Sequence, residues 1–166
     1  MGEPLQIEVS PGARINDPAH KPRTFIGSAS NSLTVARKIK AALNPKFTAE
    51  VWDTGKAFIT GQTIIEGLES AARNFDFAVL VLRCDVVVGR GKKSWAPRDN
   101  VIFEYGWFAG TFGRHRVFAV VLKGVDVEVS NVLGLTTAQY DPPKRNIASV
   151  CADIQQAILV EWEKAR

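Results

Sequence analysis

The sequence predicts an α/β fold of the flavodoxin-like type, in which helices cover both faces of a five-stranded parallel sheet to give a three-layer sandwich. Three observations favour this fold. From Arg23 onward, strand and helix patterns alternate, which is typical of parallel sheets. Residues 75–82 are apolar almost throughout, as in a strand that is buried on both faces. Five strands arranged in this way favour the order 2-1-3-4-5.

Most of the strands are predicted from short apolar runs, and the other two from their place in the alternation of strands and helices. They are expected at residues 24–27, 48–52, 75–82, 116–122 and 136–140. The helices are predicted where apolar side chains recur three or four residues apart. They are expected at residues 33–43, 63–73, 100–113 and 146–166. Between these elements, residues 53–60 are predicted to form a polar loop and residues 83–99 a long basic loop.

The helices have recognisable starts and apolar sides. Residues 30–32 are the cap region of helix 33–43, and Asp99 or Asn100 is expected to cap helix 100–113. The apolar side of helix 63–73 is predicted to contain Ile64, Ile65, Leu68 and Ala72. The apolar rows of helix 100–113 are predicted at Val101, Tyr105, Phe108 and Phe112. Small residues on its other faces, Gly106 and Gly110 among them, predict close packing there.

The chain of 166 residues has the length and composition of one globular domain. Residues 1–21 carry prolines and scattered charges without periodicity, so they are predicted to be an N-terminal tail or linker, and residues 22–166 the folded domain. No apolar run reaches the roughly 18 residues of a membrane span, and the N-terminus lacks the apolar stretch of a signal peptide. We therefore expect a cytoplasmic protein without a membrane partner.

Charge and metal-binding residue types narrow the function classes. The formal net charge of +4 suits an anionic small molecule, while the absence of a long Lys and Arg run argues against a nucleic-acid partner. Cys84 and Cys151 are far apart and are predicted to be buried, reduced thiols. There are two histidines, and His20 falls in the predicted tail, so no metal site is expected.

The predicted topology brings three segments to one crevice. In the order 2-1-3-4-5, a ligand binds at the carboxyl ends of strands 1 and 3, which here are residues 27–30 and 83–85. Glu104 lies in the early turns of the following helix and is the only charged residue of 100–113. Desolvation raises the pKa of such a carboxyl group, although the helix dipole acts in the opposite direction. The alternative is a surface glutamate that complements the start of a helix.

Other residues around this crevice are candidates for substrate contacts. Gly27, Ser28 and Ala29 form a small-residue turn whose backbone N–H groups suit an anion or a sugar. Trp52 ends the second strand, and Phe58 lies in the polar loop that follows. A tryptophan at the end of a strand is also a common core residue.

Polar candidates come from the segment before the Glu104 helix. Asp85 follows the third strand, Arg98 suits the phosphates of a nucleotide, and Asn100 begins the helix. The basic loop is equally compatible with a solvated surface. Residues 89–94 do not form a phosphate loop, because Val86 and Lys93 stand where that motif needs glycine and Ser or Thr. Neither histidine has a convincing Ser or Cys partner for a catalytic triad.

The segment from Gly89 to Arg114, with Pro-Arg-Asp-Asn-Val-Ile-Phe-Glu at residues 97–104 as its core, resembles bacterial TIR-like domains of anti-phage defence effectors. These domains were first described as predicted nucleotide-binding proteins, and some are fused to cyclic-nucleotide sensors such as STING domains. Further matches lie at residues 25–30, 51–53, 75–80 and 133–135. The resemblance covers roughly residues 23–160. Arg83 and Cys84 depart from the small or hydroxyl residues that are usual after the third strand.

This resemblance implies an NAD⁺ glycohydrolase with Glu104 as its catalytic glutamate. It implies that Ser28 and Ala29 lie beneath the nicotinamide-side ribose, and that Trp52 and Phe58 lie near the substrate. It also implies self-association through TIR–TIR stacking, and a fused or partner sensor domain that responds to a cyclic nucleotide. NAD⁺ is then the substrate, and no cofactor is expected.

One glutamate is chemically sufficient for this reaction. Most glycosidases use two carboxyl groups, because the leaving oxygen has to be protonated. Nicotinamide in NAD⁺ is already cationic and departs neutral, so no general acid is needed, and one carboxylate can stabilise the developing positive charge. Two alternatives remain open at this point: an N-glycosidase related to nucleoside deoxyribosyltransferases, and a TIR module that only assembles partners.

Overall fold

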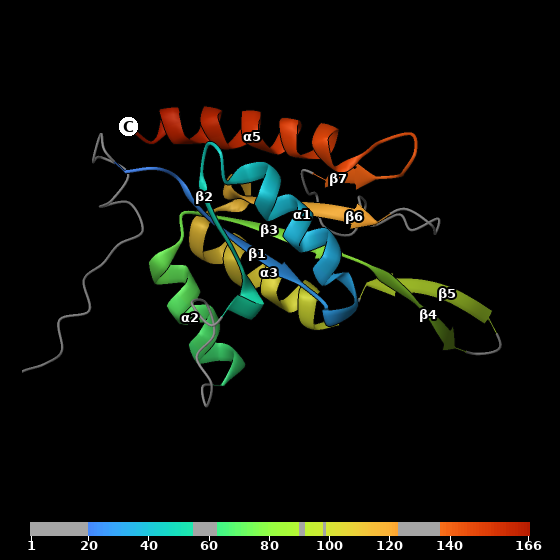
Figure 1. The fold of residues 1–166 in the computed structure, drawn as a ribbon. Helices are drawn as coiled ribbons and strands as arrows, with labels where there is room; N and C mark the ends of the chain where they lie inside the picture. The colour runs from blue at the N-terminus through green and yellow to red at the C-terminus, as the bar shows by residue number, and fades with distance from the viewer. Residues whose placement is uncertain (1–19, 55–62, 90–91, 98, 123–136) are drawn as a thin grey trace, which may run out of the picture.

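The computed structural model of the chain describes residues 20–54, 63–89, 92–97, 99–122 and 137–166. Its main sheet has five strands, β1 (Arg23–Ser28), β2 (Thr48–Val51), β3 (Phe77–Leu82), β6 (Val117–Leu122) and β7 (Thr137–Tyr140). The order is β2-β1-β3-β6-β7, and every neighbouring pair is parallel (Figure 1). This is the predicted order 2-1-3-4-5, counted over the strands of the sheet.

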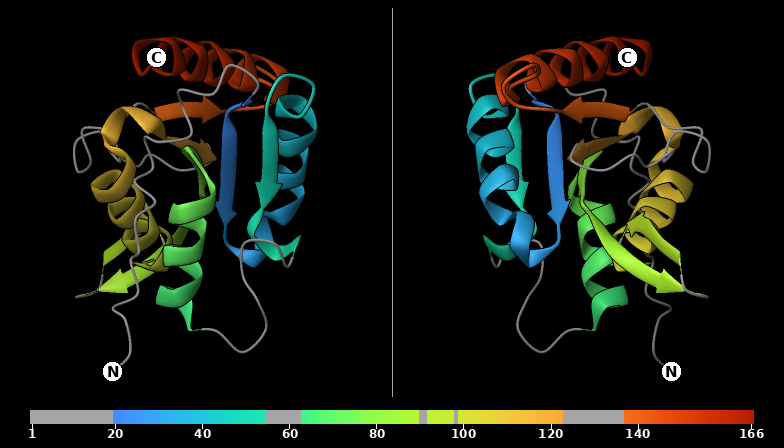
Figure 2. Two further views of the ribbon diagram at one scale, coloured as in Figure 1. Left: turned by 90° about the vertical axis from the view of Figure 1, so that its left-hand side faces the viewer. Right: turned by 90° about the vertical axis from the view of Figure 1, so that its right-hand side faces the viewer.

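Helices cover both faces of the sheet, as predicted. Helices α1 (Leu33–Leu43) and α5 (Ile147–Lys164) lie on one face, and α2 (Ile64–Asn74) and α3 (Asp99–Phe112) lie on the other (Figure 2). The fold therefore has three layers. Of the helices that the structure describes, none combines the length and the apolar composition needed to cross a membrane.

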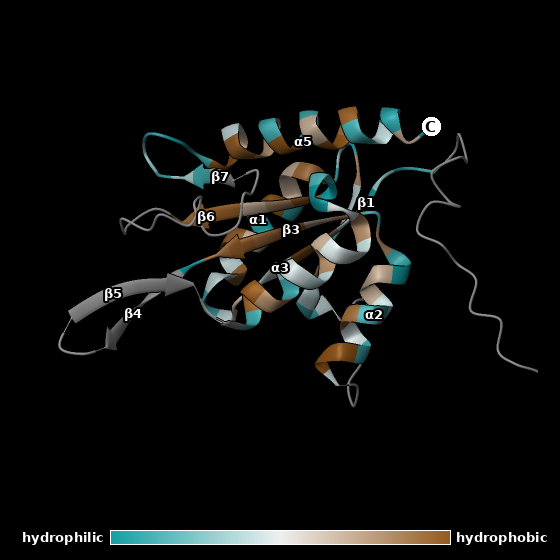
Figure 3. Cartoon of the chain, turned by 180° about the vertical axis from the view of Figure 1, so that it is seen from behind, coloured by the Kyte–Doolittle hydropathy of each residue, from teal (hydrophilic) through white to brown (hydrophobic). Residues whose placement is uncertain are grey.

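Strand β3 explains why the core has two halves. All six of its residues are buried, and successive side chains point to opposite faces of the sheet. Phe77, Val79 and Val81 pack against α1 and α5, whereas Ala78, Leu80 and Leu82 pack against α2 and α3. The hydrophobic colour of this strand is plain in Figure 3. Burial on both faces fixes β3 at the centre of the sheet, and β1 beside it.

The prediction of a long basic loop at residues 83–99 is wrong. Strands β4 (Cys84–Gly89) and β5 (Lys92–Pro97) form an antiparallel two-stranded sheet, in which Val86 pairs with Trp95. This hairpin extends away from the main sheet (Figure 1). The three consecutive valines at 86–88 have high strand propensity, which outweighs the many charges around them.

Several predicted boundaries also shift. β2 ends at Val51, and Trp52 opens the 3-10 turn η2 (Trp52–Thr54). Helix α3 already includes Asp99 and Asn100, so these residues begin the helix instead of preceding it. Gly106 and Gly110 face open space, so the close packing that was predicted at these two glycines is wrong.

The start of α2 corrects another prediction. Thr63 and Glu66 form a capping box, in which the Thr63 side chain accepts a hydrogen bond from the Glu66 N–H and the Glu66 carboxylate accepts one from the Thr63 N–H. Leu68 is buried as expected, but Ile64 and Ile65 occupy the first turn and are exposed. The predicted apolar side of this helix is therefore core only in its later turns.

Residues 1–19 of the predicted N-terminal tail lie outside the described residues. His20, which the prediction placed in that tail, contacts the domain: its Nε2 lies 3.3 Å from the Asp76 carboxylate, and its ring lies 5.8 Å from that of Trp162. Asp76 is buried and also accepts a hydrogen bond of 2.9 Å from the Arg23 N–H. This cluster stands at the amino end of β1.

Candidate active site

A cavity of about 260 Å³ lies at the carboxyl ends of β1 and β2. Its wall is formed by Ser28, Ala29, Ser30, Trp52, Ile64, Asn100 and Glu104. These residues come from β1 and the turn after it, from η2, and from the first turns of α2 and α3. This is the edge of the sheet where the direction of winding changes, which is the usual ligand position in open α/β folds.

Helix α3 brings Glu104 to this cavity. Val101, Tyr105, Phe108 and Phe112 form the buried row of α3, as predicted. Glu104 is adjacent to that row and is half-buried at its margin. Its carboxylate reaches over β1 at Gly27, where an added Cβ would lie 3.2 Å from Glu104 Oε2 and 2.5 Å from Leu80 Cδ2. Gly27 thus provides the space in which the carboxylate sits.

Burial raises the pKa of Glu104 to about 7. The helix dipole does not offset this effect, because Glu104 is the sixth residue of α3 and the dipole acts mainly over the first turn. Among the side chains that the structure describes, none forms an ion pair or a hydrogen bond with the carboxylate. Desolvation therefore dominates, and the carboxyl group is half-protonated near neutral pH.

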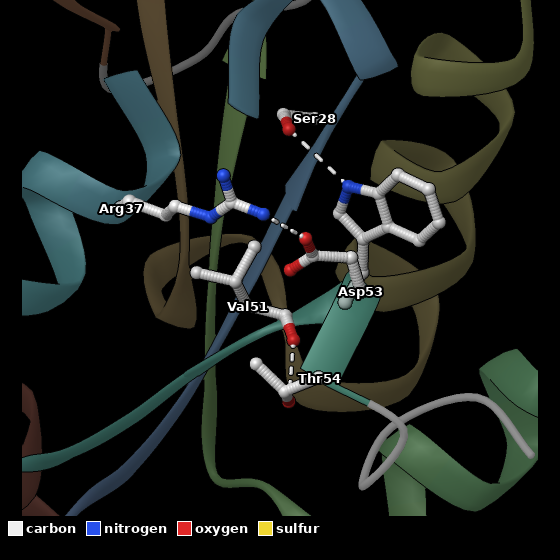
Figure 4. Close-up of polar contacts among 6 residues, drawn as sticks. Ser28, Arg37, Val51, Asp53 and Thr54 are labelled. Atoms are coloured by element: carbon white, nitrogen blue, oxygen red, sulfur yellow. Dashed lines mark hydrogen bonds and ion pairs between the residues drawn. The ribbon is translucent and has the colours of Figure 1, made fainter. Parts of the chain in front are cut away.

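A network of polar contacts fixes Trp52 in the cavity wall (Figure 4). The indole Nε1 donates a hydrogen bond of 3.3 Å to Ser28 Oγ. Next to it, Arg37 donates to the Asp53 carboxylate at 2.6 Å, and Thr54 Oγ1 donates to the Val51 carbonyl at 2.9 Å. These bonds hold the η2 turn against β1 and α1.

Trp52 combines the two roles that the sequence left open. It is half-buried and packs against both halves of the core, and it also lines the cavity beside Ser28. The indole is therefore a structural side chain that also forms part of the cavity wall.

The structure brings together most of the predicted site residues that it describes. Ser28, Ala29, Trp52, Asn100 and Glu104 share one cavity, and Gly27 lies directly beneath the carboxylate. Phe58 and Arg98 lie outside the described residues. Asp85 belongs to β4, and the position of its side chain is likewise outside the described part.

Sequence reasoning placed Ser30 at the predicted crevice without naming it as a substrate contact, and it missed Ile64 as a wall residue. Ile64 was assigned to the core face of α2. The capping box of Thr63 and Glu66 was the available signal, because it places Ile64 at the first helical position, where a side chain has no preceding turn to pack on.

A wider apolar groove adjoins the cavity. It has a volume of about 540 Å³ and is lined by Thr63, Ile64, Ile65, Asn100 and Phe103. Ile64 and Asn100 line both spaces, so the groove lies directly beside the cavity. In the described part of the chain, no three His, Cys, Asp or Glu side chains gather in a way that could hold a metal ion.

Comparison with known proteins places the chain in a family. The sequence profile of the family described as CAP12/Pycsar effector protein, TIR domain, matches residues 23–142. The chain belongs to this family. The TIR-like family and the fold predicted from the sequence are thereby confirmed.

The TIR domain is similar in sequence to several curated proteins. It is 36% identical over 123 residues to CD-NTase-associated protein 12 of Lachnospiraceae bacterium (strain RUG226), covering 73% of this chain and 38% of that protein. It is 35% identical over 150 residues to the Pycsar effector protein XpPycTIR of Xanthomonas perforans, covering 86% of this chain and 49% of that protein. It is 38% identical over 127 residues to the Pycsar effector protein PaPycTIR of Pseudomonas aeruginosa, covering 74% of this chain and 41% of that protein. The match thus spans half or less of each of these relatives.

Proposed function

We propose that this TIR domain is an NAD⁺ glycohydrolase that cleaves the bond between nicotinamide and ribose, with Glu104 as the catalytic residue. The observation that carries the proposal is a half-buried carboxylate, with its pKa raised to about 7, on the wall of a cavity at the switch point of the sheet. A desolvated carboxylate interacts strongly with positive charge, because little water is present to screen it.

The reaction needs no second carboxyl group. When the bond between ribose C1′ and the nicotinamide nitrogen breaks, its electron pair neutralises the pyridinium ring, and positive charge develops on the ribose. The ionised Glu104 stabilises that charge. A water oxygen then bonds to C1′ and loses one proton, giving ADP-ribose, nicotinamide and a proton. A carboxylate whose pKa is about 7 is suited to accept that proton.

The walls of the cavity fit a ribose and a flat ring. Ser28, whose Oγ accepts a hydrogen bond from Trp52, and the small Ala29 lie beside the carboxylate. The half-buried indole of Trp52 offers an apolar surface on the same wall. These contacts support the predicted substrate-binding roles of Ser28, Ala29 and Trp52.

We further propose that the domain works as a cytoplasmic effector in anti-phage defence, switched on when a cyclic-nucleotide sensor brings TIR domains together. Two observations support this proposal. The chain belongs to the CAP12/Pycsar effector TIR family, and its relatives are named CD-NTase-associated protein 12 or Pycsar effector protein. The domain spans less than half of most of these proteins, which leaves room in them for a second domain.

The test replaces Glu104 by glutamine in protein whose TIR domains are clustered on a scaffold. We expect nicotinamide release, measured by liquid chromatography, to fall at least about 100-fold, because the charge that stabilises the transition state is lost. Glu69→Gln is the matched control, since Glu69 is an exposed helical glutamate of α2. Equal turnover by Glu104→Gln and the parent would refute the catalytic role.

The same assay separates the alternatives. Cleavage of deoxynucleosides instead of NAD⁺ would indicate an N-glycosidase of the deoxyribosyltransferase type. If no substrate is cleaved and Glu104→Gln retains the cellular activity of the full-length protein, the domain is an assembly module.

A further inference from the structure

Three large apolar side chains are exposed together next to the candidate active site. Ile64, Ile65 and Phe103, which we call the apolar shelf, are 63%, 51% and 49% exposed. Figure 3 shows the hydrophobic colour at the start of α2. The core does not account for these residues, because Leu68, Ala71 and Ala72 already supply the buried face of α2. An exposed apolar cluster of this kind indicates a binding surface.

The apolar shelf adjoins the cavity that contains Glu104. Both spaces share Ile64 and Asn100 as wall residues, and Phe103 directly precedes Glu104 on α3. A ligand whose reacting atom lies at Glu104 therefore has the shelf as a direct neighbour. This adjacency favours an extension of the same ligand over an unrelated partner.

The size of the cavity points to the same ligand. Its volume of about 260 Å³ is below the range of about 300–1,000 Å³ that is usual for ligand pockets, and a dinucleotide is a large ligand. If the nicotinamide ribose occupies the cavity, the adenosine half must lie outside it. The groove of about 540 Å³ adjoins the cavity, and its apolar lining suits the face of a base better than a pyrophosphate.

We propose that the apolar shelf binds the second base of a dinucleotide substrate, with the adenine ring stacked on Phe103 and in contact with Ile64 and Ile65. This inference rests on the proposed function for the identity of the substrate. The Phe103 ring lies 6.2 Å from that of Trp107 at an angle of 42°, so Trp107 supports Phe103 from the helix. Asn100, on the wall between the two spaces, offers its amide to the polar linker of the dinucleotide.

The decisive experiment measures binding without turnover. Saturation-transfer NMR and calorimetry are recorded with adenosine monophosphate and ADP-ribose on the parent chain and on Phe103→Ala, Phe103→Trp and Val160→Ala. Stacking of a base on an aromatic ring implies about tenfold weaker binding for Phe103→Ala and retained binding for Phe103→Trp. Val160→Ala is the matched control, since Val160 is an exposed apolar residue of α5 that does not line either space. Circular dichroism verifies that each variant is folded.

Turnover in clustered protein gives a second readout. Nicotinamide mononucleotide has the scissile bond but no adenosine. We expect Phe103→Ala to raise the KM for NAD⁺ about tenfold and to leave cleavage of the mononucleotide unchanged. Equal losses on both substrates, or unchanged binding of adenosine monophosphate by Phe103→Ala, would overturn the proposal. So would weaker self-association of Phe103→Ala in sedimentation with unaltered nucleotide binding, because the shelf would then be a protein interface.

The two proposals fail in different ways. If the proposed function is wrong, neither NAD⁺ nor the mononucleotide is cleaved in a manner that depends on Glu104. If only the base-binding inference is wrong, both substrates are still cleaved in a manner that depends on Glu104. Phe103→Ala then changes the KM for NAD⁺ and for the mononucleotide to the same extent.

Discussion

A buried carboxyl group that ionises with difficulty becomes ionised more readily when a cation binds next to it. Burial alone raises the pKa of Glu104 to about 7, and no described side chain compensates for the lost water. In the proposed reaction the pyridinium ring brings a positive charge into the same cavity, which lowers that pKa and favours the ionised form. Part of the binding energy of the substrate is then used to prepare the catalytic group.

The raised pKa of Glu104 predicts a dependence of stability on pH. The folded state holds the Glu104 proton up to a pH of about 7, whereas the unfolded state releases it near 4.5. More protons are therefore bound to the folded state in this window, so the stability of the parent falls as pH rises through it. Glu104→Gln has no such proton and lacks this loss.

We expect Glu104→Gln to match the parent at pH 4 and to be more stable at pH 8, by up to about 3 kcal/mol at roughly 1.4 kcal/mol per pKa unit. Urea denaturation at both pH values measures the difference. An equal effect of the substitution at pH 4 and pH 8 would contradict the raised pKa.

Gly27→Ala is predicted to disturb the site through contact with the carboxylate. The new methyl group would lie 2.5 Å from Leu80 Cδ2 and 3.2 Å from Glu104 Oε2, so both side chains must move. We expect a loss of about 1–3 kcal/mol in stability and a greater loss of nicotinamide release than of NAD⁺ binding. Gly106→Ala is the matched control, because Gly106 is a helical glycine with open space around it, and alanine there should stabilise by about 0.5–1 kcal/mol. Wild-type turnover by a folded Gly27→Ala would exclude a positioning role.

At the scale of residues, the sequence predicts the part of the site that depends on topology. Glu104, Ser28 and Trp52 follow from the sheet order, because that order brings the ends of β1 and β2 and the start of α3 to one edge. The supporting role of Gly27 was not predictable, since it depends on the side-chain positions of Leu80 on the neighbouring strand β3 and of Glu104 on α3. Ile64 was missed because helical periodicity does not distinguish a buried first turn from an exposed one.

At the scale of elements, the η2 turn couples the second strand to the first. Its side chains contact β1 through Ser28 and α1 through Arg37, while its backbone continues β2. The position of Trp52 in the cavity wall therefore depends on bonds from two neighbouring elements, and a change in either is transmitted to the wall.

A double-mutant cycle between Trp52 and Ser28 should measure this coupling. Trp52→Phe keeps an aromatic ring and removes the N–H donor, and Ser28→Ala removes the acceptor of the 3.3 Å hydrogen bond. We expect each single change to lower stability by about 0.5–1.5 kcal/mol, and the double variant to lose about 0.5–1 kcal/mol less than the sum. Urea denaturation of the four proteins provides the cycle. Strict additivity would mean that the bond contributes nothing.

The β4–β5 hairpin is the element that the sequence did not predict. β1, β3 and β6 of the main sheet have apolar runs between turn residues, and the alternation with helices indicated the two shorter strands β2 and β7. The hairpin has lysines at 92 and 93 and proline at 97, and those residue types favour loops. Its strands pair with each other and not with the main sheet, so the number and order of the sheet strands were still correct.

At the scale of the whole molecule, the site lies along one edge of the sheet. Among the described residues, the ends of strands and the early turns of helices border the cavity and the apolar groove. A neighbouring subunit placed over this edge would exclude water from Glu104 and strengthen its interaction with the substrate. The isolated domain is therefore expected to be a poor catalyst.

We predict that specific activity rises with protein concentration and is highest when the domains are clustered on a scaffold. The reason is that a neighbour which binds only the competent form shifts the population towards that form. The measurement is nicotinamide release per milligram of protein over a dilution series, compared with the clustered protein. Constant specific activity across both would show that the domain needs no neighbour.

The contacts of His20 have a practical consequence for the choice of a shortened protein. Cutting at the predicted boundary of residue 22 would remove a ring that packs near Trp162 and a partner of the buried Asp76 carboxylate. Asp76 would then accept a hydrogen bond only from the Arg23 N–H among these contacts. Arg23 would lie almost at the new N-terminus, where the backbone frays readily. Versions of the domain made for biophysical work should begin no later than His20. We expect versions that begin later to melt at a lower temperature, although the residues of the candidate active site, at the opposite end of β1, are unchanged.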